Sequence, residues 1–327
     1  MQNPIVVTGA AGFIGTNVVR ALNARGRRDV IVVDRLGRDE KWRNLVDQSF
    51  ADYLDLEDFR ARVRRDELPA LAAVIHLGAC SSTTETDADY LMDNNFAYTR
   101  ELCEWCVRHG VRFVYASSAA TYGDGTRGYD DDHALLRDLR PLNMYGYSKH
   151  VFDLWAQNKG LLDRIAGLKY FNVYGPWEDH KGDMRSVVHK AYHQILETGK
   201  VQLFKSHRDD YEDGGQVRDF VWVDDAVRQT LWLADHREVN GVFNCGTGRA
   251  RSWVDLARAV FAALGREPRI EFVEMPAHLR AKYQYHTCAD LHKVRRAGYD
   301  TPFTELEDGI QAYVREYLLD RFPPEPA

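Results

Sequence analysis

The chain has 327 residues, of which 45% are hydrophobic and 28% charged, a composition typical of a folded globular protein and not of a disordered one. Its formal net charge of -6 argues against a nucleic-acid-binding surface, and no apolar run approaches the roughly 20 residues of a membrane span. An apolar strand at residues 5–7 leaves no room for a signal peptide. We therefore expect a cytoplasmic protein that binds neither nucleic acid nor membrane.

The cysteines are odd in number and scattered, which does not fit a disulfide framework. They are Cys80, Cys103, Cys106, Cys245 and Cys288. The CxxC of Cys103 and Cys106 has no second pair to complete a tetrahedral zinc site. We expect reduced thiols, with these two packed as small hydrophobic side chains and no bound metal.

Short apolar runs alternate with amphipathic stretches through the first half of the chain. The runs are Ile5–Thr8, Val30–Asp34, Ala73–Leu77, Phe113–Ala116 and Ile165–Phe171, with helical patterns such as Phe13–Ala24 and Tyr98–His109 between them. Near-continuous apolar runs suit strands that are covered by helices on both faces. The pattern predicts an α/β fold with a doubly wound parallel Rossmann sheet.

After about Asn172 the alternation gives way to segments rich in Gly, Pro, Asp and His, and residues 205–216 form a polar stretch that predicts an exposed loop. A strand at Val242–Asn244 and a helix at 252–264 with Ser252 as N-cap are expected beyond it. We expect residues 1–171, with part of 217–245, to form a dinucleotide-binding Rossmann domain. Residues 172–327 are expected to form a smaller mixed α/β substrate-binding domain.

Glycines follow the first strand in the pattern GxxGxxG, at Gly9, Gly12 and Gly15, and a helix begins within it. Glycines let the backbone approach a pyrophosphate, and the helix N-terminus offers free N–H groups and a partial positive charge. Asp34 ends the second strand at the spacing expected of a dinucleotide-binding unit. This arrangement predicts a nicotinamide dinucleotide site.

The residues around Asp34 bear on which dinucleotide binds. The carboxylate alone favours NAD, because it accepts the ribose 2′-hydroxyl and repels a 2′-phosphate. Arg35, Arg38 and Lys41 follow it, and these cations could cradle that phosphate, although a solvated basic loop would look the same. We favour NADP and keep NAD as the alternative.

Tyr145 and Lys149 form a YxxxK element in a helix-compatible stretch, which places the phenol and the ammonium on one helix face. A nearby cation and an oxidised nicotinamide favour the phenolate, which can then take a proton from a sugar hydroxyl. Ser118, at the end of a predicted strand, can orient the reacting oxygen. These residues predict hydride chemistry at a hydroxyl-bearing carbon.

In this order, the glycine motif, the strand-end serine and YxxxK resemble the extended short-chain dehydrogenase/reductases, specifically the NAD-dependent epimerase/dehydratase family, over the whole chain. Several segments resemble one subfamily, the ADP-L-glycero-D-manno-heptose 6-epimerases. They are Cys80–Glu85, Met92–Asn95, Pro141–Lys149, Tyr170–Pro176 and His180–Gly182. The first and last of these are specific to the subfamily, and the others are shared among many sugar-nucleotide enzymes.

Inversion needs a second acid–base group, because a ketone that is re-reduced on its other face no longer points its oxygen at the first one. Lys181 can serve if its pKa is lowered, and the subfamily uses a lysine in this motif, which favours it over His180. A phosphate-contacting or solvated lysine is the alternative. Ala119 and Ala120 stand where dehydratases carry an acidic pair, which argues against elimination.

The resemblance also implies binding residues. Those toward the cofactor, besides the glycines, Asp34, Arg35, Lys41, Lys149 and Lys181, are Phe13, Ile14, Leu77, Gly78, Ala79, Cys80, Ser81, Asn94 and Val173. Those toward the substrate are Asn172, Asp183, Lys190, Phe204, Lys205, Ser206, His207, Arg218 and Tyr283. Asp219 is expected to orient Arg218 rather than to meet the substrate.

Three residues depart from the subfamily's pattern: Asp183 replaces a serine, Lys190 a histidine, and Leu56 a second basic residue at the 2′-phosphate; the 205–216 loop is also longer. The resemblance implies inversion at C6 of ADP-D-glycero-D-manno-heptose by transient oxidation, for lipopolysaccharide-core synthesis, in a homo-oligomer. The alternatives are a 4-epimerase of another nucleotide hexose and a non-catalytic NADP-sensing protein.

Overall fold

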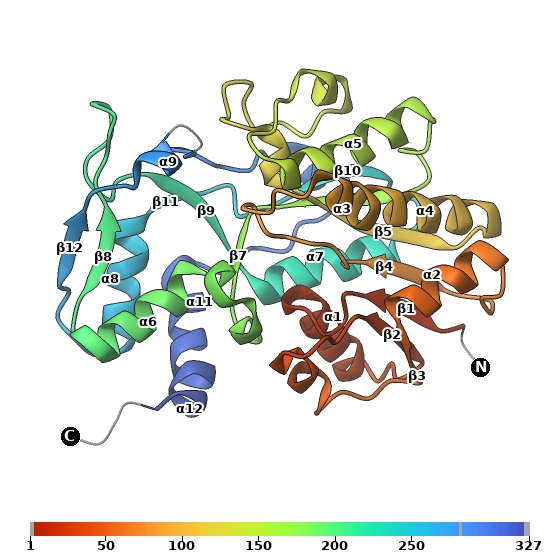
Figure 1. The fold of residues 1–327 in the computed structure, drawn as a ribbon, viewed down its shortest axis with the longest axis horizontal. Helices are drawn as coiled ribbons and strands as arrows, with labels where there is room; N and C mark the ends of the chain where they lie inside the picture. The colour runs from red at the N-terminus through yellow and green to blue at the C-terminus, as the bar shows by residue number, and fades with distance from the viewer. Residues whose placement is uncertain (1–2, 281–282, 324–327) are drawn as a thin grey trace.

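The computed structural model describes residues 3–280 and 283–323, and its centre is a seven-stranded sheet (Figure 1). Every neighbouring pair in this sheet is parallel. In spatial order the strands are β10 (Gly241–Cys245), β6 (Ala166–Tyr170), β5 (Arg112–Ser118), β4 (Ala73–His76), β1 (Ile5–Thr8), β2 (Val30–Asp34) and β3 (Asp52–Asp55). The predicted apolar runs are all strands of this sheet, with ends displaced by at most two residues.

Helices cover both faces of the large sheet, which confirms the doubly wound prediction (Figure 1). On one face α1 (Phe13–Ala24) and α7 (Val223–Asp235) pack against β1 and β2. On the other lie α4 (Tyr98–His109) and α5 (Met144–Asn158). Cys103 and Cys106 of α4 are fully buried in this core, as their spacing predicted.

A smaller part of the molecule lies beside the large sheet, at the left of Figure 1. It holds a three-stranded sheet of β7 (Asn172–Tyr174), β9 (Val217–Trp222) and β11 (Ala250–Ser252), and a pair of β8 (Val201–Phe204) with β12 (Ile270–Val273). Helices α6 (Val187–Thr198), α8 (Trp253–Ala263) and α11 (Leu306–Tyr313) share a second apolar core with these strands. Ser252 caps α8 in a capping box with Asp255, as predicted.

Most of the remaining elements are short, and α2 is the longest of them. They are η1 (Glu40–Leu45), α2 (Leu56–Arg65), α3 (Ala88–Leu91), η2 (Met92–Ala97), η3 (Ala119–Tyr122), η4 (His133–Asp138), η5 (Asp179–Met184), α9 (Ala277–Arg280), α10 (His292–Arg296), η6 (Val314–Leu318) and α12 (Leu319–Arg321). Residues 205–216 form the predicted loop. None of the helices in the described ranges is long and apolar enough to cross a membrane.

Candidate active site

The glycine loop between β1 and α1 has the backbone that a dinucleotide pyrophosphate needs. Gly9 has φ +65°, and a Cβ there would lie 2.7 Å from the Gly78 nitrogen. A Cβ on Gly15 would lie 1.9 Å from the Gly9 oxygen. Gly12 caps α1 without a side-chain hydrogen bond, and the first turn carries no acidic residue. The helix N-terminus therefore keeps free N–H groups for an anion, so the residues fit the cofactor.

Asp34, at the end of β2, is buried and fully engaged by its neighbours. One carboxylate oxygen accepts from the Ala11 backbone N–H at 2.8 Å, and the other accepts from the Arg35 N–H and the Lys41 ammonium, each at 2.8 Å. Lys41 therefore neutralises the carboxylate. Arg35 is exposed and pairs with Glu57.

The YxxxK element occupies the first turns of α5, whose N-cap Asn143 accepts from the Gly146 N–H at 2.8 Å. The ammonium of Lys149 is buried and donates to the Ala116 carbonyl at 2.9 Å. Ser118 ends β5, and its hydroxyl accepts from the Ala120 N–H at 3.1 Å. Tyr145, Lys149 and Ser118 thus line one cleft of about 520 Å³, together with the glycine loop.

Burial dominates the electrostatics of this cleft. It raises the pKa of Tyr145, while the hydrogen bond with Ser118 lowers it. Burial also lowers the pKa of Lys149 to about 8, against the raising effect of Asp153 and Cys80. Lys149 therefore titrates about one pH unit above neutrality.

Lys181 reaches the same cleft from η5, which the three-residue strand β7 and a turn connect to the large sheet. Its ammonium lies 5.0 Å from the centroid of the Phe13 ring. Burial lowers the pKa of Lys181. The neighbouring His180 has a pKa lowered to about 4 by burial, and its Nδ1 lies 3.1 Å from the Asn44 amide nitrogen. His180 is neutral at pH 7 and its ring is committed to this contact, so of these two neighbouring residues Lys181 is the one that can carry a charge in the cleft.

Most residues expected to hold the cofactor line this cleft. They are Gly9, Gly12, Phe13, Ile14, Gly15, Asp34, Lys41, Leu77, Gly78, Ala79, Cys80, Ser81, Lys149, Val173 and Lys181. Arg35 and Asn94 are not among the lining residues. The Asn94 side chain instead donates to Asn95 at 3.1 Å.

Asn95 is a site residue that sequence reasoning missed. It is fully buried, and its amide accepts from the Cys80 N–H and donates to the Cys80 carbonyl, each at 2.9 Å. It also donates to Ser148 in α5 at 3.0 Å. Asn95 therefore ties the loop after β4 to the helix that carries Tyr145. Asn95 ends the segment Met92–Asn95, whose resemblance to the subfamily could have marked it as a site residue.

Three of the residues expected to meet the substrate come together in the smaller part of the molecule. Arg218 is buried, with its guanidinium 5.4 Å from the ring centroid of Trp253 and 5.2 Å from that of Tyr283. Tyr283 in turn contacts Phe204, with 6.4 Å between ring centroids. These groups form a buried cation–aromatic cluster.

The other expected substrate residues are more dispersed, and none lines the cleft around Tyr145. Asn172, Asp183 and Lys190 are exposed, and Lys190 donates to the Asp183 carbonyl at 2.6 Å. On the 205–216 loop, Lys205 and His207 lie 3.0 and 3.6 Å from Glu274. The Ser206 N–H donates to Asp213 at 2.8 Å.

The expectation that Asp219 orients Arg218 is wrong. Successive residues of a strand point to opposite faces, and both belong to β9. Asp219 accepts instead from the backbone N–H groups of Thr247, Gly248 and Ala289, at 2.7, 2.9 and 3.0 Å. Its role is to fix the turn after β10 and the segment around Ala289.

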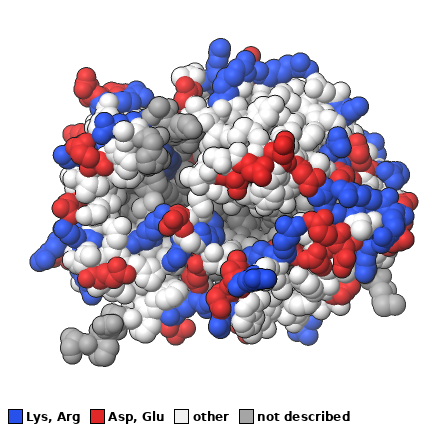
Figure 2. Space-filling model, viewed as in Figure 1, with Lys and Arg blue, Asp and Glu red and all other residues white. Residues whose placement is uncertain are grey.

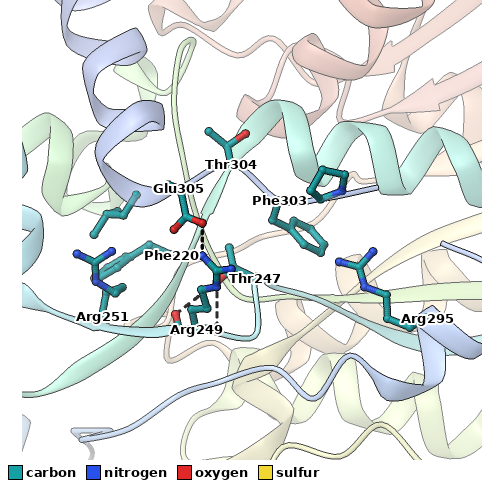
Figure 3. Close-up of a pocket in the computed structure, with 10 residues that line it drawn as sticks. Phe220, Thr247, Arg249, Arg251, Arg295, Phe303, Thr304 and Glu305 are labelled. Carbon is teal, nitrogen blue, oxygen red and sulfur yellow. Dashed lines mark hydrogen bonds and ion pairs between the residues drawn. The ribbon is translucent and has the colours of Figure 1, made fainter. Parts of the chain in front are cut away.

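The surface is hollowed between the large and the smaller part, and acidic and basic side chains are interspersed around the hollow (Figure 2). A separate pocket lies in the smaller part, lined by three arginines (Figure 3). Arg249 pairs there with Glu305, Arg251 with Glu307, and Arg295 donates to the carbonyls of Tyr299 and Thr301. These arginines are already engaged within the protein, so we assign this pocket no ligand.

Comparison with known proteins agrees with the cleft's geometry. An ADP-L-glycero-D-manno-heptose-6-epimerase of Nitratidesulfovibrio vulgaris is 56% identical over 319 residues, covering 97% of this chain and 99% of the relative. The solved Helicobacter pylori enzyme of that name has a TM-score of 0.81 at 26% identity, covering 96% of each chain. A Thermus thermophilus UDP-glucose 4-epimerase, solved with NAD, has a TM-score of 0.74 at 28% identity, covering 95% of this chain and 97% of the other.

A family model also matches residues 5–246, which include the glycine loop, Ser118, Tyr145, Lys149 and Lys181. The match takes in the seven strands of the large sheet and the loop that brings Lys181 to the cleft. With near-full-length relatives at this identity, the chain belongs to the NAD dependent epimerase/dehydratase family.

Proposed function

We propose that the protein interconverts ADP-D-glycero-D-manno-heptose and ADP-L-glycero-D-manno-heptose by transient oxidation at C6. The observation that carries this proposal is the placement of Tyr145 and Lys181, which enter one cleft from separate segments of the chain next to the glycine loop. A cleft with one acid–base group would suit a dehydrogenase, whereas inversion needs two. The name of the Nitratidesulfovibrio relative supports the choice of sugar.

The residues divide the reaction between them. A bound oxidised nicotinamide supplies the acceptor for hydride from C6 and the means of returning it. Tyr145, as phenolate, takes the proton of the C6 hydroxyl, Ser118 orients that oxygen, and Lys149 stabilises the phenolate through its charge. Once the ketone has turned its other face toward the nicotinamide, Lys181 would protonate the ketone oxygen as hydride returns to C6. The protein starts the reverse reaction from the same two groups with their roles exchanged.

We infer that NADP is the cofactor. Lys41 neutralises Asp34, so a 2′-phosphate meets a cation where it would otherwise meet an acid, and Arg35 could add a second cation only by leaving Glu57. Leu56 supplies no further charge. The Thermus 4-epimerase was solved with NAD, so NAD stays the alternative cofactor.

We further propose that residues 172–327 hold the nucleotide sugar, while residues 1–171 with part of 217–245 hold the cofactor. Arg218 offers a buried planar guanidinium for the diphosphate, and Phe204 and Tyr283 offer aromatic faces beside it. Asn172, Asp183, Lys190, Lys205, Ser206 and His207 would complete the sugar and nucleotide contacts. We expect a homo-oligomer, which analytical ultracentrifugation would test.

The deciding experiment incubates the purified protein with ADP-D-glycero-D-manno-heptose and follows the product's stereochemistry at C6. We expect the L-glycero product. Its absence, together with epimerisation of UDP-galactose, would replace this proposal with a 4-epimerase.

A sensor is distinguished by Tyr145→Phe. In an enzyme this variant keeps cofactor binding and loses about 10²- to 10⁴-fold in turnover. In a non-catalytic sensor, Tyr145→Phe would also keep cofactor binding. Neither the variant nor the unaltered protein would show turnover.

A further inference from the structure

The loop that carries Lys181, residues 176–186 (the Lys181 loop), has a constrained backbone. Trp177 has φ +74°, which bulky side chains rarely adopt, and Gly182 has φ +52°. A bulky residue in this conformation is strained, and it persists only where the surrounding structure holds it in place. The contacts that hold this loop should therefore be visible in its neighbours.

The strongest of these contacts come from the carboxyl-terminal helical segment. Asp179 lies two residues before Lys181, and its carboxylate accepts from the Tyr317 hydroxyl and pairs with the Arg321 guanidinium, both at 2.6 Å. His189 of α6 contacts the other oxygen at 3.1 Å. Burial alone would raise the pKa of Asp179, but these hydrogen bonds and Arg321 lower it, so the carboxylate is ionised at neutral pH.

Glu178 provides a second attachment beside the first. Its side chain is fully buried and accepts from the Tyr313 hydroxyl at 3.1 Å and from the Ser186 hydroxyl at 2.6 Å. Its backbone carbonyl accepts from the Lys181 N–H at 3.0 Å. The Lys181 backbone is thus one hydrogen bond from a residue anchored to α11.

Trp177 is contacted by two cations. The Arg20 guanidinium of α1 lies 4.8 Å from its ring centroid, and that of Arg321 lies 5.7 Å away. The Tyr317 ring meets the same indole edge to face, with 5.3 Å between centroids. Tyr317 and Arg321 therefore each contact the Lys181 loop at two residues, Trp177 and Asp179.

The other side of the loop is fastened to the cofactor loop. The Asn44 amide donates to the Ala11 carbonyl at 2.9 Å and to the Trp177 carbonyl at 3.3 Å. The Asn17 amide donates to the Pro176 carbonyl at 3.0 Å. The Lys181 loop is therefore clamped between the glycine loop and the carboxyl-terminal helices.

We propose that Tyr317 and Arg321 are positioning residues that hold Lys181 in the cleft by fixing Asp179 and Trp177. The inference rests on the proposed role of Lys181 as the second acid–base group. A lysine ammonium sits on a flexible four-carbon stem, so its position in the cleft depends on a fixed backbone. Neither residue touches the substrate or cofactor cleft, because both act from the far side of the loop.

The test compares Tyr317→Phe with Tyr192→Phe. Both changes remove one hydroxyl, and both hydroxyls bond at the carboxyl-terminal segment, since Tyr192 donates to the carbonyls of Leu318 and Phe322 at 3.2 and 2.6 Å. Tyr192 does not bond to the Lys181 loop. We expect kcat to fall about tenfold or more in Tyr317→Phe with KM little changed, and less than twofold in Tyr192→Phe. Arg321→Met should behave as Tyr317→Phe does.

A second readout needs no turnover. Trypsin cleaves after Lys181 and Arg185 once the loop is released, and the fragments are identified by mass. We expect faster cleavage at these bonds in Tyr317→Phe and Arg321→Met than in the unaltered protein, and no change in Tyr192→Phe. Unfolding midpoints are recorded for all variants, so that a general loss of stability is recognised.

The outcomes separate the two proposals. If the unaltered protein makes no L-glycero product, the proposed function fails, while the cleavage pattern still reports whether Tyr317 anchors the loop. If Tyr317→Phe keeps both its kcat and its resistance to trypsin, the positioning role is wrong. Equal losses in Tyr192→Phe and Tyr317→Phe would also overturn it, because they would reflect a loosened helix rather than the bond to Asp179.

Discussion

The ammonium of Lys41 lies 2.8 Å from the carboxylate of Asp34, so the acidic residue that ends β2 carries its own counter-charge. This pair bears directly on cofactor choice, because an uncompensated carboxylate there repels a 2′-phosphate. Lys41→Ala removes both the counter-charge and a donor to that phosphate. We expect NADP⁺ affinity to fall about 10- to 100-fold, as for loss of a charged hydrogen bond, and NAD⁺ affinity to change little.

Isothermal titration calorimetry of cofactor-free protein with each dinucleotide measures the two affinities. Lys200→Ala is the control, because Lys200 is an exposed lysine that pairs with Glu271 in the smaller part of the molecule. If Lys41→Ala weakens the binding of NAD⁺ and NADP⁺ equally, Lys41 stabilises the loop but does not contact the 2′-phosphate.

Gly15→Ala should damage the cofactor site through sterics alone. The added methyl would lie 1.9 Å from the Gly9 oxygen and 2.9 Å from the Ala10 Cα, both backbone atoms that cannot swing aside. We expect loss of measurable dinucleotide binding and a destabilisation of about 2 kcal/mol or more, in the range of overpacked cores. Gly26 has φ +77° but open space around it, so Gly26→Ala should lower the free energy of unfolding by about 1 kcal/mol and leave dinucleotide binding intact. Equal cofactor affinity in both variants would contradict this account.

The sequence predicted the large sheet well where burial is complete. Strands β1 and β2 are buried at every residue, and their apolar runs have no competing pattern. Strand β3, Asp-Tyr-Leu-Asp, lies at the sheet's edge and has one buried residue. It contains no apolar run, so the sequence pattern did not predict it. The motif-bearing residues Tyr145, Lys149, Ser118 and Lys181 were all placed in one cleft, because motifs mark groups that act on a ligand.

The residues that support this cleft were harder to find. Asn44 and Asn95 act through hydrogen bonds to backbone groups that are distant in sequence. A single asparagine belongs to no repeating pattern, so the sequence alone does not predict these bonds. Lys169 reads as an ordinary residue of an apolar run, yet it is fully buried with Asp153 at 3.0 Å. Asp219 was misassigned because its partners lie in two segments distant in sequence, at residues 247–248 and at Ala289. Strand alternation shows that Asp219 points away from Arg218 but does not identify these partners.

Arg218 should govern affinity for the nucleotide sugar without governing chemistry. Its guanidinium is buried beside two aromatic rings, donates to the Val217 carbonyl, and forms no ion pair among the described residues. Burial lowers its pKa from an initially very high value, so it stays charged at neutral pH. Arg218→Lys keeps the charge but loses the planar fork. We expect KM to rise about tenfold with kcat within threefold, whereas a matching loss of kcat would place Arg218 at the reacting end.

The pH dependence should follow Lys149 and its neighbour Asp153, one helical turn further along α5. Lys149 supports the Tyr145 phenolate only when it is protonated, and burial lowers its pKa to about 8. The value of kcat/KM should therefore fall as the pH rises through about 8. Asp153 raises the pKa of Lys149, while Cys80 acts in the same direction and the nearby His76 is neutral because burial lowers its own pKa. Removing the Asp153 charge should move the alkaline limb to lower pH.

Asp153 also accepts from Tyr115, Ser117 and Lys169, at 2.9, 2.7 and 3.0 Å, so Asp153→Asn alone leaves a buried ammonium without its partner. That loss costs about 3–5 kcal/mol, and the double variant Asp153→Asn with Lys169→Met avoids it. For a displacement of about one pH unit, kcat/KM at pH 8 falls about fivefold relative to the unaltered protein at the same pH. Asp163→Asn, an exposed acid beyond the helix, should leave the profile unchanged. Circular dichroism checks that the double variant is folded. If its alkaline limb does not move, Lys149 does not set that limb, because Asp153 is the charge that most raises the pKa of Lys149.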